Sequence, residues 1–177
     1  MTTSAQGRTL RLAFARVGLA LAAWIGIVGL SLVAGAQEGG GETDGSANIK
    51  VVQDAYGAFG KGDIPGVIAL LTPDVHWESV GNPADFPALG PKHGTAAVEE
   101  QFKTLGSLLS FQSFEPRQFF AAASDTVFVL GHYDRTVLRT GRRANSDFVH
   151  VFVIKDGKIA SYREFQDTAT LADAWRE

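Results

Sequence analysis

The chain of 177 residues contains no cysteine. Disulfide bonds, thiolate catalysis and lipid attachment through a cysteine are therefore excluded. Its four histidines show no spacing typical of metal ligands, and no cluster of acidic residues accompanies them, so we expect no metal site. The sequence has no pattern typical of a serine nucleophile. Nothing in it requires a cofactor, and we expect that none is bound.

A surplus of basic residues is also missing. The formal net charge is −3, and it becomes −6 if the three arginines of the N-terminal segment are removed. No basic stripe stands out along the rest of the chain, whereas proteins that bind nucleic acid usually carry one. We therefore expect no nucleic-acid partner.

The N-terminal segment differs from the rest of the chain. Three arginines within residues 8–16 precede the run Val17–Ala34, which carries no charge. A basic start, an apolar run and small residues before Gln37 are typical of a secretory signal, here cleaved after Ala36. The run is also just long enough to span a bilayer, which takes roughly 17–25 residues, so a retained transmembrane anchor is the alternative. We expect an exported protein (periplasmic, secreted or at the cell surface) that meets a membrane only through such an anchor.

The segment Gln37–Ser46 is rich in glycine and acidic residues and has no apolar residue, which predicts a flexible linker. The remainder has a size suited to one domain that buries roughly two-thirds of its unfolded surface. The expected organisation is a signal or anchor in residues 1–36, a linker in 37–46 and one domain in 47–177.

Within the domain, apolar residues at helical spacing predict a helix that ends near Gly60, a second helix capped by Asp63, and a third that begins at Thr95. A short strand at 74–80 and a long loop at 81–94 separate the second and third helices. From Phe111 onward the period is that of four strands joined by short turns, and a last helix follows Asp167 as N-cap. This order predicts an α+β domain with a curved antiparallel sheet and helices on one face.

Counting back from the turns predicts which side chains share a face. A two-residue turn at Thr140-Gly141 sets Tyr133 opposite Phe148. In the next hairpin a two-residue loop would set His150 opposite Arg163, and a three-residue loop would set it opposite Tyr162 and diagonal to Glu164. We prefer the three-residue loop, because it places aliphatic residues on one face of the sheet and aromatic and polar residues on the other. One face then holds Val149, Val151, Val153 and Ile159. The other receives Tyr133, Arg135, Phe148, His150, Phe152, Tyr162, Glu164 and Gln166.

An aromatic face on which polar groups converge is typical of a ligand cavity. Histidine exchanges protons near neutral pH, so His150 is the expected proton carrier, with Glu164 as its orienting group or alternate base. Arg135 or Tyr56 would polarise an oxygen of the ligand. The alternatives are a core histidine satisfied by one hydrogen bond and a simple buried ion pair of Glu164 with Arg135. The predicted substrate-binding residues are Tyr56, Trp77, Phe86, Phe102, Tyr133, Phe148 and Tyr162.

Five stretches occur in an order that resembles the SnoaL-like branch of the nuclear transport factor 2-like superfamily. They are "YGAFGKGD", "LLTPDVHWESVG", "HGTAAVEEQF", "FVHVFVIKDGKI" and "REFQDTATL". The resemblance covers Ile49 to Leu171 and implies a cystatin-like α+β roll, in which helices pack on the concave face of the sheet around a cone-shaped cavity. The superfamily includes ketosteroid isomerase, polyketide cyclases, limonene epoxide hydrolase and scytalone dehydratase, besides non-catalytic members.

When the functional positions of ketosteroid isomerase are compared one by one with this sequence, the resemblance is partial. The general-base aspartate of the isomerase falls on Ser79, which cannot act as that base, and its oxyanion-stabilising acid falls on His150. Its pocket tyrosine falls next to Tyr56. The Asp-Arg-Asp cluster of the epoxide hydrolase is incomplete, since Val137 stands two residues beyond Arg135. The match is closest in the cavity itself.

Two functions follow. The first is a cofactor-free acid–base enzyme (isomerase, dehydratase or cyclase) acting on a small, mostly apolar, oxygenated molecule. The second is an exported module that binds such a molecule in the same cavity without chemistry. In either case an aliphatic sheet face around Val151 would be exposed in a monomer, so we expect a homodimer through the convex face.

Overall fold

The computed structural model describes residues 41–123 and 125–176. The expectations for a signal, an anchor and a cleavage site fall on residues 1–40 and lie outside the described residues. No helix within the described ranges is long and apolar enough to cross a membrane.

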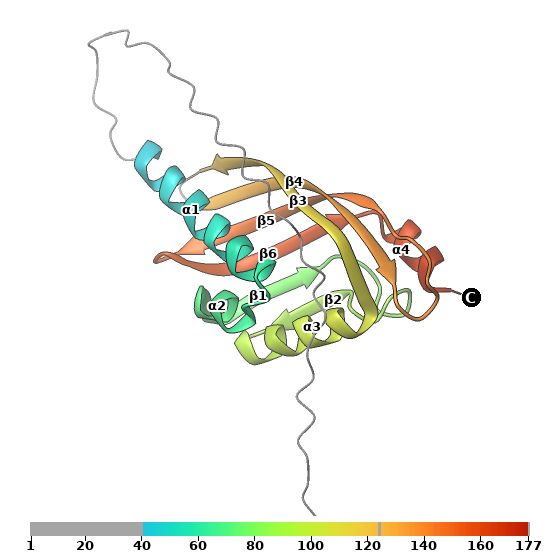
Figure 1. The fold of residues 1–177 in the computed structure, drawn as a ribbon. Coiled ribbons are helices and arrows are strands. Elements are labelled where there is room, and N and C mark those ends of the chain that lie inside the picture. The colour runs from blue at the N-terminus through green and yellow to red at the C-terminus, as the bar shows by residue number, and fades with distance from the viewer. Residues whose placement is uncertain (1–40, 124, 177) are drawn as a thin grey trace, which may run out of the picture.

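The domain is α+β, as the order of elements predicts. Its elements are α1 (Gly41–Gly60), α2 (Ile64–Ala69), β1 (Leu71–Ser79), β2 (Gly90–His93), α3 (Thr95–Leu108), β3 (Leu109–Ala122), β4 (Thr126–Val137), β5 (Ser146–Lys155), β6 (Lys158–Gln166) and α4 (Thr168–Trp175). The sheet order is β2-β1-β6-β5-β4-β3. Figure 1 shows α1, α2 and α3 along one side of a strongly curved sheet. The sheet is mixed and not wholly antiparallel, because β1 and β6 run parallel.

Helix α1 begins at Gly41, earlier than the sequence predicts, and includes the last residues of the expected linker. The cause is a close approach of helix and sheet. Gly45 is buried, and a Cβ on it would lie 3.0 Å from the Cβ of Ala121 at the end of β3. Glycine is a poor helix former, so this turn owes its place to packing and not to propensity.

The predicted caps are confirmed at two helices. Asp63 accepts a hydrogen bond from the Gly66 backbone at 2.9 Å, and Asp167 accepts one from the Thr170 backbone at 2.9 Å. Each carboxylate satisfies a backbone N–H that has no partner inside its helix.

One strand was not predicted. β2 lies inside the expected loop at 81–94 and pairs antiparallel with β1, with His76 opposite His93. Its four residues contain a glycine and a proline, so they carry no period-two signal. β1 itself starts at Leu71, three residues before the start of the strand that the sequence predicts.

The pairing of β4 with β5 differs from the predicted register by two residues. Tyr133 lies opposite Ser146 and Gly131 opposite Phe148, because the ladder ends well before the turn at Thr140-Gly141. A shift of two residues leaves every side chain on its predicted face. The face assignment therefore holds although the predicted partners were wrong.

The hairpin of β5 and β6 also differs from both counts. Asp156 and Gly157 form a two-residue turn with φ of 51° and 72°. The pairing then skips Ala160, so that His150 lies directly opposite Glu164 and not opposite Tyr162 or Arg163. The two-residue turn alone would place Glu164 on the outer face, and the residue added by this bulge brings it back to the inner face.

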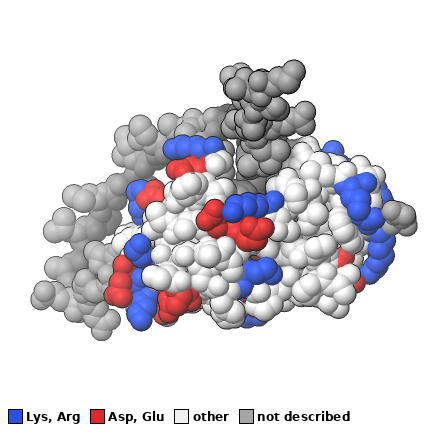
Figure 2. All heavy atoms as spheres, turned by 90° about the horizontal axis from the view of Figure 1, so that it is seen from below, with Lys and Arg blue, Asp and Glu red and all other residues white. Residues whose placement is uncertain are grey.

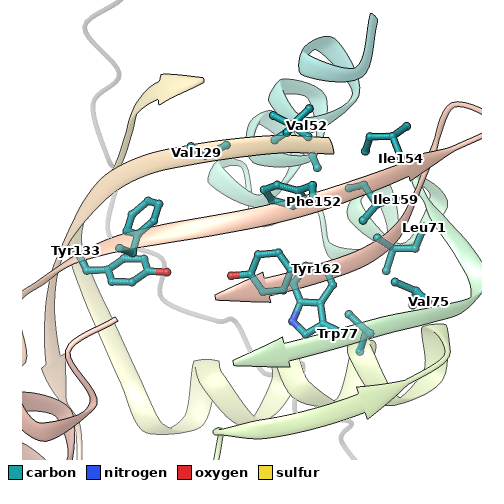
Figure 3. Close-up of a cluster of buried hydrophobic side chains, with 14 residues drawn as sticks. Val52, Leu71, Val75, Trp77, Val129, Tyr133, Phe152, Ile154, Ile159 and Tyr162 are labelled. Atoms are coloured by element: carbon teal, nitrogen blue, oxygen red, sulfur yellow. The ribbon is translucent and has the colours of Figure 1, made fainter. Parts of the chain in front are cut away.

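The bulge also corrects the prediction for Ile159. Ile159 is fully buried inside the domain and pairs with Ile154, which is buried as well. It therefore does not belong to the outer aliphatic face. In a strand of regular alternation Ile159 and Tyr162, three residues apart, would point to opposite sides of the sheet, but the bulge takes up one residue between them. Both point into the core in Figure 3.

β3 owes its curvature to two further irregularities. Its pairing with β4 skips Gln112 and Arg117. Bulges of this kind bend and twist a strand. As a result Phe111 and Phe114 both reach the inner side of the sheet, where they join the buried cluster beneath α1.

Candidate active site

A cavity of about 80 Å³ lies between the inner face of the sheet and the helices. Its walls are mostly aromatic: Tyr56, Phe59, Trp77, Phe86, Phe102, Phe111, Phe114, Tyr133, Phe152 and Tyr162. Five other polar or charged residues also line it: Ser79, Arg135, His150, Glu164 and Gln166. An apolar enclosure with a few converging polar groups is the usual composition of a small-molecule site.

His150 is the centre of the polar groups and is 2% exposed. Its Nδ1 lies 2.8 Å from the hydroxyl of Tyr56. Its Nε2 lies 2.7 Å from the hydroxyl of Tyr133 and 3.1 Å from that of Tyr162. Figure 3 shows the hydroxyls of Tyr133 and Tyr162 pointing toward each other from β4 and β6. The histidine is thus bonded to phenols on both of its nitrogens.

Glu164 lies opposite His150 on β6 and is 7% exposed. Tyr133 donates a hydrogen bond to its Oε1 at 2.5 Å, and Ser79 donates one to its Oε2 at 2.5 Å. The same Oε1 lies 3.7 Å from Nε2 of His150. Both carboxylate oxygens therefore accept short bonds from hydroxyls.

These contacts fix the direction of the hydrogen bonds. A phenol has one proton, and Tyr133 donates it to Glu164, so its oxygen accepts from Nε2–H of His150. In the neutral ring Nδ1 is then the acceptor and takes the proton of Tyr56. The chain runs from Tyr56 through His150 and Tyr133 to Glu164. The protonated nitrogen of His150 is Nε2.

Burial lowers the pKa of His150, and the nearby negative charge of Glu164, whose Oε1 lies 3.7 Å from Nε2, offsets this only in part. Burial would raise the pKa of Glu164, but the proximity and charge of His150, the charge of Arg135 and the hydrogen bond from Ser79 lower it to about 2. The pKa of Glu164 is also lowered when His150 is neutral, because the charge of Arg135 and the hydrogen bonds from Ser79 and Tyr133 stabilise the carboxylate independently of the histidine. At neutral pH the site therefore contains a carboxylate beside a neutral imidazole.

The three phenols keep their protons. Burial, followed by the negative charge of Glu164, raises the pKa of Tyr56, Tyr133 and Tyr162 well above the usual value. Phenolate forms are thus disfavoured. These hydroxyls can donate hydrogen bonds and relay protons, but they cannot act as standing bases.

Arg135 is 3% exposed and sits on the same face of β4. Its Nε donates to the carbonyl of Ala144 at 3.0 Å, and one terminal nitrogen donates to Oε1 of Gln166. Its guanidinium carbon lies 4.6 Å from the ring centroid of Tyr133. The ion pair with Glu164 that the sequence allowed is not formed by direct contact.

The predicted aromatic residues fall in three places. Tyr56, Tyr133 and Tyr162 bond to His150. Trp77 stacks on Tyr162 with ring centroids 3.9 Å apart and meets Phe102 edge to face at 5.5 Å. These residues and Phe86 all line the cavity.

Phe148 is placed differently from the prediction. It is buried behind the site and stacks on His150 at 4.1 Å and on Tyr133 at 4.4 Å, but it does not line the cavity. Its ring lies across Gly131, where a Cβ would come within 2.1 Å of it. We assign Phe148 to the support of His150 and not to ligand contact.

Sequence reasoning missed two contributions. Ser79 was considered only as a substitute for a base, whereas it donates to Glu164 from the end of β1. Phe111 and Phe114 entered no site prediction, because the bulges of β3 cannot be counted from the sequence. Parity along β1 places Ser79 on the face of Trp77, and that signal could have found it.

Comparison with known proteins agrees with this description. The sequence profile of the SnoaL-like domain matches residues 52–162, and the chain belongs to the SnoaL-like domain family. A search of curated protein sequences gave no match.

Among solved structures, the chain is similar to an NTF2-like protein from Burkholderia xenovorans LB400, with 30% identity and a TM-score of 0.67 over 74% of this chain and 97% of that one. An NTF2-like protein of unknown function from Burkholderia pseudomallei K96243 shows 29% identity and a TM-score of 0.66 over 72% and 96%. TerC, co-crystallised with polyporic acid, shows 29% identity and a TM-score of 0.63 over 72% and 97%.

Proposed function

We propose that this SnoaL-like domain binds a small, mostly apolar, oxygenated molecule in its cavity and transfers a proton to or from it without a cofactor. The observation that carries the proposal is a buried neutral imidazole whose nitrogens both end on phenols of the cavity wall. The reaction class is isomerisation, dehydration, cyclisation or hydration. TerC, a solved structure to which this chain is similar, was co-crystallised with polyporic acid.

The proton would pass through Tyr56. The ligand gives a proton to the oxygen of Tyr56 as Tyr56 gives its own to Nδ1 of His150, which becomes an imidazolium. Nε2–H continues to donate to Tyr133, and the carboxylate of Glu164 at 3.7 Å stabilises the new charge. Return of the proton at another atom of the ligand completes the reaction. His150 stores the proton, and Tyr56 is the group in contact with the ligand.

A binding module without chemistry is the second candidate. One observation favours it: both nitrogens of His150 and both oxygens of Glu164 already have partners within the protein. A fully bonded polar cluster can simply stabilise and orient a core. The isomerase's base position is also occupied by Ser79, which has no basic group.

Hydrogen exchange separates the two candidates without knowledge of the reaction. The molecule that co-purifies with the protein from its native host is identified by mass spectrometry and then incubated with the protein in D₂O. A proton-transfer enzyme introduces deuterium at a carbon that does not exchange in buffer. A molecule recovered without deuterium, with the cavity occupied, rejects catalysis and leaves binding.

For the N-terminus we propose export by the general secretory route with cleavage after Ala36. The support is the sequence pattern of residues 1–36. Mass spectrometry of protein from the native host should find Gln37 as the first residue. Recovery of peptides from residues 8–16 in the membrane fraction would establish the anchor instead.

For assembly we propose a homodimer through the outer face of the sheet. Leu130 and Phe165 are 37% and 39% exposed there, and Val149, Val151 and Val153 lie between them half-buried. Contiguous apolar surface of this kind is rare on monomers, and a two-fold axis would cover it with its own copy.

A further inference from the structure

Arg135 is a buried cation whose contacts are all neutral. It is 3% exposed, and its hydrogen bonds go to a backbone carbonyl and to the side-chain oxygen of Gln166. Among the residues that the structure describes, no carboxylate lies within 4.0 Å of its guanidinium. Moving a cation out of water costs several kcal/mol, so buried arginines usually contact an anion. No described residue supplies such an anion to Arg135.

Glu164 does not fill it. Its two oxygens accept the short bonds of Ser79 and Tyr133, and its charge reaches Arg135 only through space. The guanidinium instead faces the ring of Tyr133. The one buried carboxylate of the site is thus already bonded to other groups.

The unused hydrogen-bonding groups of the cavity are donors. Gln166 accepts from Arg135 through Oε1, which leaves its NH₂ group directed elsewhere. No hydrogen bond of the described residues uses that NH₂ group or the second terminal nitrogen of Arg135. The proton of Tyr162 is also free for a ligand, since Nε2–H of His150 donates toward its oxygen. All three residues line the cavity.

The acceptors show the opposite pattern. Nδ1 of His150 takes the proton of Tyr56, and both oxygens of Glu164 are occupied. A ligand that brings donors would therefore find only hydroxyl oxygens such as that of Tyr56 and would otherwise have to displace protein bonds. A ligand that brings an anionic oxygen would meet a charged arginine and two neutral donors at no such cost.

We propose that the cavity binds a monoanionic aromatic ligand, a ring carrying one carboxylate or one ionised enol or phenol, with the anionic oxygen at Arg135 and Gln166. The ring lies among Trp77, Phe102 and the phenylalanines of β3. The inference rests on the proposed function in one respect, namely that the cavity is a ligand site, and it adds the charge class of the ligand. In the complex Arg135 gains the anion that its buried position lacks.

Matched acids and amides test the charge class. Benzoate and 2-naphthoate are titrated into the full chain at pH 7, and benzamide and 2-naphthamide serve as neutral counterparts of the same shape. Calorimetry gives the dissociation constants, and the indole signal of Trp77 in NMR spectra reports whether the ligand enters the cavity. We expect at least one acid to bind about tenfold or more tightly than its amide.

Two variants assign the preference to the site. Arg135→Gln should abolish the preference for acid over amide, and Gln166→Glu should reverse it by placing a second negative charge beside the ligand. Arg143→Gln, which removes an exposed arginine that bonds to Asp134, should leave the preference unchanged. Circular dichroism checks that each variant is folded. If Arg135→Gln does not fold, the inference is decided by the ratio of acid affinity to amide affinity in the wild type and in Gln166→Glu.

Equal affinity for acid and amide, or a preference that persists in Gln166→Glu, overturns the inference but leaves the cavity as a ligand site. Failure of both acids to bind also overturns it. In that case a co-purified neutral molecule in the cavity would preserve the proposed function, whereas an empty cavity would remove it as well.

Discussion

The two faces of the three strands β4, β5 and β6 both depart from the usual distribution of residues. The inner face buries Tyr133, His150 and Glu164, and the outer face exposes Leu130 and Phe165. Sheets with one solvated face normally place apolar side chains inside and polar ones outside. Burying polar groups and exposing apolar ones both cost free energy, so each departure indicates a function. In the proposals above the inner face binds the ligand and the outer face binds a second copy of the chain.

Away from this region the surface is ordinary. Figure 2 shows blue and red side chains next to each other on the face that carries α3. Lys103, for example, lies 3.2 Å from Glu99 and 3.6 Å from Glu100. Exposed pairs of this kind contribute little to stability, so we look for function on the sheet and not there.

The largest effect is expected from the inner histidine. Replacing His150 by Gln removes the group that stores the proton, and the rate of deuterium incorporation should fall about 10²–10⁴-fold. His132 lies on the outer face and bonds to Asp147 at 2.8 Å, so His132→Gln is the matched control and should keep the full rate. An unchanged rate in His150→Gln would reject the assignment.

The next effect is on stability in acid. The pKa of Glu164 is about 2, below its ordinary value of 4.5, so the folded state binds fewer protons than the unfolded state in this range. Its contribution, about 3 kcal/mol, is fully present above pH about 4.5 and is lost as the pH falls toward 2. The lowered pKa of His150 acts in the same direction from its ordinary value of 6.5 downward.

Urea unfolding at several pH values measures this loss. Between pH 5 and pH 2 the wild type should lose about 3 kcal/mol more than Glu164→Gln, in which that carboxyl is absent. All other carboxylates are common to both proteins and cancel in the difference. Parallel pH profiles for the two proteins would mean that Glu164 does not hold its charge in the folded state.

On the outer face a charge should break assembly. Val151 lies on β5 in the middle of the apolar surface, and burying a lysine there without a partner is costly. Val151→Lys should raise the dimer dissociation constant about a hundredfold in sedimentation analysis and leave ligand affinity unchanged. Asn145→Lys adds the same charge at an exposed loop position and should not change assembly. A wild type that sediments as a monomer at micromolar concentration would contradict the proposal.

The smallest effect concerns a single hydroxyl. Ser79→Ala removes one of the two short bonds to Glu164 and should cost about 1.5 kcal/mol of unfolding free energy at neutral pH. Ser161 has partial exposure on β6, and Ser161→Ala should change stability by less than about 0.5 kcal/mol. Equal effects at both positions would show that the bond from Ser79 contributes nothing beyond an ordinary surface hydroxyl.

The sequence alone predicts the class of fold, two helix caps and the face on which each residue of β4 and β5 lies. These depend on local patterns: the spacing of apolar residues, a carboxylate before a helix, and alternation along a strand. The same patterns place His150, Glu164 and Tyr133 on one wall. A two-residue shift in register, as between β4 and β5, does not disturb them.

Other features depend on contacts between distant segments. The pairing of β1 with β6, which brings Ser79 to Glu164, joins residues far apart in the sequence. The first turns of α1 form against the end of β3 although their composition is that of a linker. The bulges of β3 have no marker in its residues. In each case tertiary packing overrides the local preference, so the local sequence cannot show it.

The extra residue at Ala160 is a spare unit of length in β6. Deleting it would restore regular alternation and leave Ile159, Tyr162 and Glu164 on the inner face, because the pairing already passes over it. Inserting one residue after it would instead act on the strand as a frameshift acts on a coding sequence, turning Arg163 inward and Glu164 outward. Among homologous sequences, the segment between Asp156 and Glu164 should therefore tolerate the loss of one residue but not the gain of one.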